Sequence, residues 1–176
     1  MDRRKQLIDL LKDWGIAAAV TLLVFGVWNA LRPDPPPAGG DAPQLVVPRV
    51  EGETYDLTAE TADVVVVNFW ATWCGPCRAE IPEFSAFAEA NTDVRVLGVS
   101  VDDDMQPMQL SRAARQLGIT YPVLHDRSAS ARAAWGVDVF PTTFVLDRHR
   151  HVVAVRAGQA SRGWLEQTVA QARAGH

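Results

Sequence analysis

Residues 63–70 read DVVVVNFW, an apolar run rich in β-branched side chains. A strand with one face in water alternates apolar and polar residues, whereas this run stays apolar at successive positions. The run therefore predicts a central strand that is covered on both faces, with a layer of structure on each side of the sheet. Strand and helix patterns alternate through the rest of the chain, which predicts an α/β fold, a three-layer sandwich around one mixed sheet.

The individual elements follow from periodicity and from turn residues. We expect strands or extended segments over 45–57 (a short edge hairpin with Gly52 near its turn), 63–70, 93–102, 121–126, 142–147 and 151–157. We expect helices from Cys74 to about Ala90, over 104–119, over 128–137 and from Ser161 to Ala174. The three carboxylates Asp102, Asp103 and Asp104 are interpreted as a strand end and the N-cap of the next helix.

The N-terminal region contains an 18-residue stretch without a charged side chain, from Trp14 to Leu31. As a helix it would span roughly 27 Å, close to the thickness of the bilayer core. A buried core helix would show a polar face, and a signal peptide would have a shorter apolar region followed by a small-x-small site. We therefore predict a transmembrane anchor over 14–31, preceded by a cytoplasmic segment over 1–13 that carries Arg3, Arg4, Lys5 and Lys12.

Six of the eleven prolines lie between residues 32 and 48. Proline fixes φ and lacks an N–H, so residues 32–44 are predicted to form an extended linker to a domain over 45–176. The net charge of −4 disfavours nucleic acid as a partner, because nucleic-acid-binding proteins usually present a basic face.

Both cysteines of the chain, Cys74 and Cys77, are separated by Gly75 and Pro76 and follow the predicted central strand directly. At the start of a helix, free N–H groups and the helix dipole favour the thiolate of Cys74, which makes it the attacking nucleophile. Cys77, one turn later, can resolve a mixed disulfide. Three alternatives compete: two buried structural cysteines, a zinc site, and a structural disulfide. A zinc site needs four ligands, and the four histidines supply no matching spaced pair. A structural disulfide would enclose only four residues.

The string VVNFWATWCGPCRAEIPEF resembles the active-site segment of the membrane-anchored TlpA/ResA-like branch of the thioredoxin superfamily. The resemblance extends from about Leu45 to Gln171 and includes GVDVFPTTFVLD, where the family has its cis-proline. It implies a thioredoxin-like fold and a thiol–disulfide oxidoreductase on the outer side of the bacterial inner membrane, in the periplasm or its equivalent.

Carried to individual positions, the resemblance implies Cys74 as the attacking thiol, Cys77 as the resolving thiol, and a cis bond between Phe140 and Pro141. Proline at that place leaves the preceding backbone free to pair with a client chain. Trp73, Gly75 and Pro76 would complete the client-binding surface, whereas Trp70 is assigned to packing.

Thioredoxin uses an aspartate and a lysine as a proton relay. In this chain Asn68 occupies the position of that aspartate, and no lysine follows Lys12. Glu80 matches the acidic position of the TlpA/ResA-like branch, and a buried carboxyl there can exchange a proton with Cys77. The competing interpretation of Glu80 is a solvated helix carboxylate, as expected for Glu83 and Glu89.

The resemblance implies reduction of disulfides in client proteins, with electrons from a membrane donor of the DsbD or CcdA type. Family clients include apocytochrome c, at its haem-attachment cysteines, and copper-site proteins of oxidase assembly. No cofactor or metal is expected beyond the cysteine pair itself. Two alternatives remain open: a disulfide-forming oxidase, and a copper-binding assembly module that uses Cys74 and Cys77 as ligands.

Overall fold

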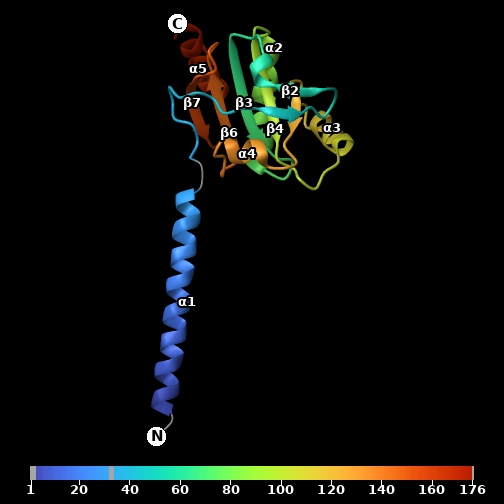
Figure 1. The fold of residues 1–176 in the computed structure, drawn as a ribbon. Coiled ribbons are helices and arrows are strands. Elements are labelled where there is room, and N and C mark those ends of the chain that lie inside the picture. Colours follow the sequence, from blue (N-terminus) through green and yellow to red (C-terminus); the bar gives the residue numbers. More distant parts are fainter. Residues whose placement is uncertain (1–2, 32–33, 176) are drawn as a thin grey trace. The chain divides into compact units, whose positions relative to one another are not determined.

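The computed structural model describes residues 3–31 and 34–175, which belong to two compact units, Met1–Pro33 and Asp34–His176. The first unit is a single helix, α1 (Arg3–Leu31), shown in blue in Figure 1. Large apolar side chains are exposed along it, from Trp14 to Trp28. Among the residues that the structure describes, no helix is both long and apolar enough to cross a membrane. The predicted transmembrane anchor over 14–31 is therefore not confirmed.

The second unit contains a five-stranded mixed sheet in the order β5-β4-β3-β6-β7. β3 pairs in parallel with β4 and antiparallel with β6, so it occupies the centre. The strands are β3 (Val64–Trp70), β4 (Val94–Ser100), β5 (Val123–His125), β6 (Thr142–Leu146) and β7 (Val152–Ala157). The helices are α2 (Gly75–Ala90), α3 (Pro107–Gln116), α4 (Ser130–Ala134) and α5 (Arg162–Ala174).

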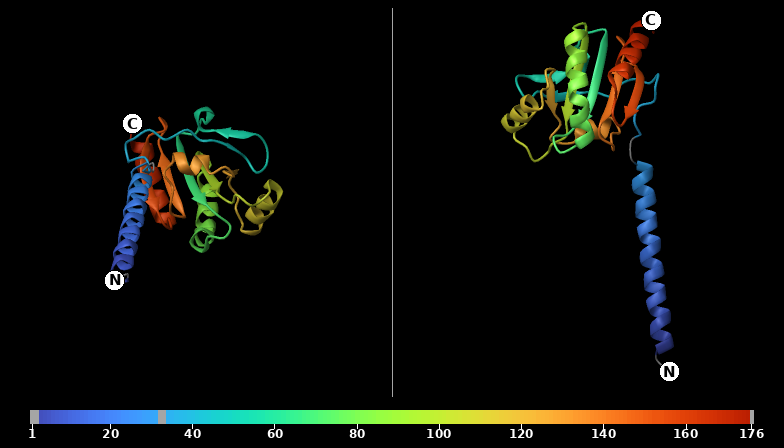
Figure 2. Two further views of the ribbon diagram at one scale, coloured as in Figure 1. Left: turned by 60° about the horizontal axis from the view of Figure 1, so that its bottom comes forward. Right: turned by 180° about the vertical axis from the view of Figure 1, so that it is seen from behind.

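All seven residues of β3 are buried, as the unbroken apolar run predicts. Val64 and Val66 face one hydrophobic cluster, which includes Phe84 and Phe87 of α2 and the buried apolar side chains of α5. Val65 and Val67 face the opposite cluster, which includes residues of the β1–β2 hairpin and Trp135 beside α4. Figures 1 and 2 show the β1–β2 hairpin on one face of the sheet and helices α2 and α5 on the other. The predicted α/β sandwich with a central mixed sheet is confirmed.

The hairpin predicted over 45–57 consists of β1 (Val46–Pro48) and β2 (Thr54–Asp56), followed by the short 3-10 helix η1 (Leu57–Ala59). The turn contains Gly52 at φ +100, a conformation that glycine adopts without strain. The two strands form a separate two-stranded sheet and do not extend the main one.

The described part of the predicted linker packs against the domain. The amide of Gly39 donates to the carbonyl of Val152 at 2.7 Å, and the amide of Val152 donates to the carbonyl of Gly40 at 2.8 Å. A Cβ atom on Gly136 would lie 2.5 Å from the backbone carbon of Asp34, so the chain crosses Gly136 closely. The second compact unit therefore includes residues of the predicted linker from Asp34 onward, because the N–H of Gly39 and the carbonyl of Gly40 pair with the edge strand β7.

Candidate active site

The two cysteines form a disulfide at the N-terminus of α2. Cys74 is the N-cap residue, and its Sγ accepts a hydrogen bond of 3.2 Å from the amide of Cys77. Cys74 is 6% exposed and Cys77 is fully buried. The sulfur of Cys74 therefore lies where the first turn of the helix presents its unpaired N–H groups.

The aromatic residues beside the cysteines occupy two different environments. Trp70, the last residue of β3, is buried, whereas the side chain of Trp73 is 67% exposed. Its ring packs edge-to-face against Phe140, with 5.9 Å between the ring centroids. The sequence predicts this division, with one tryptophan in the core and the other on the flank of the site.

The Phe140–Pro141 peptide bond is cis, as the resemblance implies. The next residue, Thr142, begins β6 and pairs with Phe69 near the end of β3. The loop from β3 to Cys74 leaves from this same end of the strands. The proline and the cysteine pair therefore lie at one end of the sheet. Gly75 and Pro76 are exposed on the first turn of α2.

Glu80 is buried on α2, one turn after Cys77. Its Oε1 accepts a hydrogen bond of 2.8 Å from the side-chain amide of Asn68, and its Oε2 accepts one of 2.9 Å from the backbone amide of Ala160. Burial raises the pKa of Glu80 to about 7, opposed by these two donors and by the charge of Arg156. Glu83 and Glu89 are exposed on the same helix. Glu80 is therefore not the solvated helix carboxylate of the competing interpretation.

The partners of Glu80 extend the site to other elements. Asn68 on β3 also donates to the hydroxyl of Thr143 on β6, at 3.1 Å. Beyond β7, Gln159 donates through its side-chain amide to the carbonyl of Pro76, at 3.1 Å. The loop after β7 therefore contacts both the cysteine turn and the buried carboxylate. Sequence reasoning assigns neither Thr143 nor Gln159 to the site.

Asp102 is a second buried carboxylate at this end of the sheet, 1% exposed. It accepts hydrogen bonds from the amide of Thr72 at 3.0 Å, the hydroxyl of Thr72 at 2.7 Å and the hydroxyl of Ser100 at 2.7 Å. The predicted role of Asp102–Asp104 as the cap of the next helix is wrong, because Gln106 is the N-cap of α3. Asp102 instead holds the loop that leads to Cys74.

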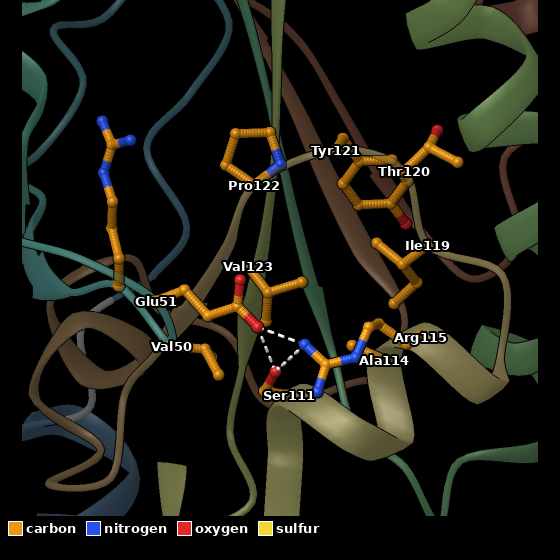
Figure 3. A pocket seen from close by; sticks show the side chains of 11 residues that line it. Val50, Glu51, Ser111, Ala114, Arg115, Ile119, Thr120, Tyr121, Pro122 and Val123 are labelled. Atoms are coloured by element: carbon orange, nitrogen blue, oxygen red, sulfur yellow. Dashed lines mark hydrogen bonds and ion pairs between the residues drawn. The ribbon is translucent and has the colours of Figure 1, made fainter. Parts of the chain in front are cut away.

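A pocket of about 340 Å³ lies elsewhere, between the β1–β2 turn and α3. Figure 3 shows Glu51, Ser111 and Arg115 joined by hydrogen bonds at its side and Pro122 and Tyr121 on its wall. None of its lining residues belongs to the predicted site. Among the described residues, no group of three or more His, Cys, Asp and Glu side chains is arranged to hold a metal ion.

The sheet, the cysteine pair at a helix N-terminus and the cis-proline beside it define a thioredoxin-like thiol–disulfide oxidoreductase. The chain belongs to the Redoxin family, whose model matches residues 37–174. Thiol-disulfide oxidoreductase ResA from Geobacillus thermodenitrificans (strain NG80-2) is 30% identical over 131 residues, which cover 73% of this chain and 74% of that relative.

Solved structures support the same assignment of the fold. A thiol:disulfide interchange protein DsbE from Chlorobium tepidum matches with a TM-score of 0.70 and 26% identity, over 78% of this chain and 98% of that one. StoA from Bacillus subtilis matches with a TM-score of 0.63 and 20% identity, over 74% of this chain and 98% of that one. At that lower identity the StoA match bears on the fold alone.

Proposed function

We propose that this oxidoreductase reduces disulfides of client proteins outside the cytoplasm. The observation that carries the proposal is the different placement of the two cysteines, one at the N-terminus of α2 and the other within its first turn. Cys74 caps α2 beside the exposed Trp73, whereas Cys77 is fully buried behind it. Such an arrangement offers one sulfur to a client and keeps the other for the second step.

The reaction follows from this arrangement. The thiolate of reduced Cys74 attacks one sulfur of the client disulfide, the client S–S bond breaks, and a mixed disulfide forms. The thiolate of Cys77 then attacks Cys74, which releases the second client sulfur and leaves the Cys74–Cys77 disulfide. Two electrons pass to the client, and a membrane donor of the DsbD or CcdA type is proposed to restore the dithiol. The cysteine pair carries the electrons, so we propose that no bound cofactor takes part.

Glu80 is proposed to accept the proton of the Cys77 thiol in the second step. Residues three apart on a helix lie on the same face, so its carboxyl and the Cys77 sulfur share one side of α2. A group with a pKa of about 7 is half ionised near neutral pH, which suits a proton acceptor that must also return the proton.

Client binding is proposed to use the exposed Trp73, the turn at Gly75 and Pro76, and the backbone of Phe140 before Pro141. Proline donates no hydrogen bond, so an extended client segment can pair with the backbone beside it. Apocytochrome c and copper-site proteins are the client classes that we propose, on the ground of the family resemblance.

Insulin turnover with dithiothreitol tests the reaction, because a reductase accelerates precipitation of the insulin chains. The Cys77→Ser variant should accumulate a mixed disulfide between Cys74 and the client, visible on a non-reducing gel. The Cys74→Ser variant should form none. Failure of the wild-type chain to accelerate insulin reduction would overturn the proposal.

The reduction potential of the cysteine pair separates the reductase from the disulfide-forming oxidase. Values near about −270 mV are typical of thioredoxin, and values near about −120 mV are typical of the oxidant DsbA. We expect a value near the first. A value near the second would make the protein a disulfide donor. No observation on the described residues favours the copper-binding module.

We also propose that the segment from Trp14 to Leu31 attaches the protein to the bacterial inner membrane and leaves the domain outside. The support is its 18 uncharged residues, the cations Arg3, Arg4, Lys5 and Lys12 before it, and the exposure of its apolar side chains. Carbonate extraction of membranes tests the attachment. Recovery of the protein in the soluble fraction would contradict it.

A further inference from the structure

Two aromatic rings and one guanidinium form a continuous rim beside the cysteine pair. The ring of Trp73 packs against Phe140, and the guanidinium carbon of Arg132 lies 5.3 Å from the centroid of the Phe140 ring. Val139, the neighbour of Phe140, is 55% exposed. Apolar surface and a positive charge are thus presented together at the end of the sheet where a client disulfide would meet Cys74.

Arg132 is held in place from several sides. Its Nε donates to the carbonyl of Val137 at 3.1 Å, and its backbone amide donates to Asp126 Oδ2 at 2.7 Å. The carboxylate of Asp126 is buried and also accepts from the backbone amide of Ala131. The bonds to Asp126 hold the backbone at the start of α4, and the Nε bond together with the contact on Phe140 orients the guanidinium before any client binds.

The terminal nitrogens of Arg132 remain available for a ligand. Among the described residues, no carboxylate forms an ion pair with Arg132, whereas Arg95, Arg115, Arg162 and Arg173 each have one. The Nε bond to Val137 leaves the two terminal NH₂ groups, which donate in one plane and suit a carboxylate.

The positive charge of Arg132 is opposite in sign to the net charge of the domain. From Pro33 onward the chain has 12 arginines and 18 carboxylates, so the domain as a whole is negative. A client with an acidic segment is repelled by the domain at long range and gains only from a cation close to its own disulfide. Arg132 is the cation that stacks on the aromatic flank of Cys74.

We propose that Arg132 selects clients that carry an acidic side chain within about two residues of the attacked cysteine. The inference rests on the proposed reductase function and names the client chemistry that this site prefers. The client carboxylate would accept hydrogen bonds from the terminal nitrogens of Arg132 while a neighbouring apolar side chain packs on Trp73. Partly exposed pairs of this kind are worth about a threefold change in rate or affinity.

Disulfide-bonded peptides that differ at one position test the proposal. In each pair, one residue within two positions of the attacked cysteine is Glu in one peptide and Gln in the other. The reduced full-length chain, kept in non-ionic detergent, is mixed with each peptide, and the rate of peptide reduction is followed. At the best position, the wild-type chain should reduce the Glu peptide about threefold faster than the Gln peptide.

Variants of Arg132 separate charge from structure. Arg132→Gln should abolish the preference, Arg132→Glu should reverse it, and Arg132→Lys should retain part of it. Arg148→Gln is the matched control, because it removes the same charge from the β6–β7 turn, at the end of the strands that lies away from the cysteine pair. It should keep the wild-type preference.

Equal rates for the Glu and Gln peptides at every position would overturn the inference and leave the reductase function standing. The same holds if Arg132→Gln keeps the full preference. If the wild-type chain reduces neither peptide nor insulin, the proposed function fails, and the inference fails with it.

Discussion

The buried carboxyl of Glu80 should make the stability of this protein fall as the pH rises. Its pKa is raised from 4.5 to about 7 because burial penalises the charged form. A raised pKa in the folded state means that the protonated carboxyl favours folding. The stability is therefore fully present below about pH 4.5 and is lost as the pH rises through about 7. At about 1.4 kcal/mol per pKa unit, the loss amounts to about 3 kcal/mol.

Glu80→Gln should remove this pH dependence of the unfolding free energy and lower that free energy by an amount that does not change with pH. The new amide keeps one acceptor oxygen but presents its NH₂ group to one of the two donors, Asn68 or Ala160. An unpaired buried donor costs about 1–3 kcal/mol. The variant should thus be less stable than the wild type at pH 4.5. At pH 8.5 it should be equally or more stable.

Urea unfolding of the disulfide-bonded chain in non-ionic detergent, from pH 4.5 to 8.5, measures the effect. The difference in unfolding free energy between wild type and variant cancels the contributions of the titratable groups that both chains share. Glu83→Gln is the matched control, because it makes the same substitution at an exposed position of the same helix. If the difference for Glu80→Gln stays constant across this range, the raised pKa and its assigned cause are both wrong.

Three further substitutions test the packing of the domain. Asp102→Ala leaves the amide and hydroxyl of Thr72 without their buried acceptor and should lower the unfolding free energy by about 2–3 kcal/mol, measured by urea unfolding. Gly136→Ala places a Cβ atom 2.5 Å from the backbone of Asp34 at a φ of +59 and should cost at least about 1 kcal/mol, measured by thermal unfolding. Gly163→Ala meets no atom within 4 Å on α5 and should instead stabilise by about 0.5–1 kcal/mol.

The features that could be predicted from the sequence are local ones. The run from Val64 to Trp70 is predicted as a central strand because its side chains are almost all apolar and need to be buried on both faces. The spacing of the two cysteines after it identifies the start of the next helix. The surroundings of Glu80 could not be predicted in this way, because its two donors lie 12 and 80 residues away in the chain. The prediction that Asp102, Asp103 and Asp104 cap the next helix is wrong for the same reason. A carboxylate near a helix start can accept from several N–H groups, and only the packed fold selects Thr72.

The segment between Gly39 and Val50 reaches both edges of the five-stranded sheet. Gly39 and Gly40 pair with the start of β7, and the amide of Val50 donates to the carbonyl of Val123 on β5 at 3.0 Å. Open strand edges are the places where β-proteins aggregate, because their N–H and C=O groups can pair with another copy. By pairing with β5 and β7, the segment hinders association of two copies of the chain through their edge strands. A shortened chain that begins at Leu45 would keep the contact with β5 and lose the one with β7. We expect such a chain to self-associate through β7 even though its active site is intact.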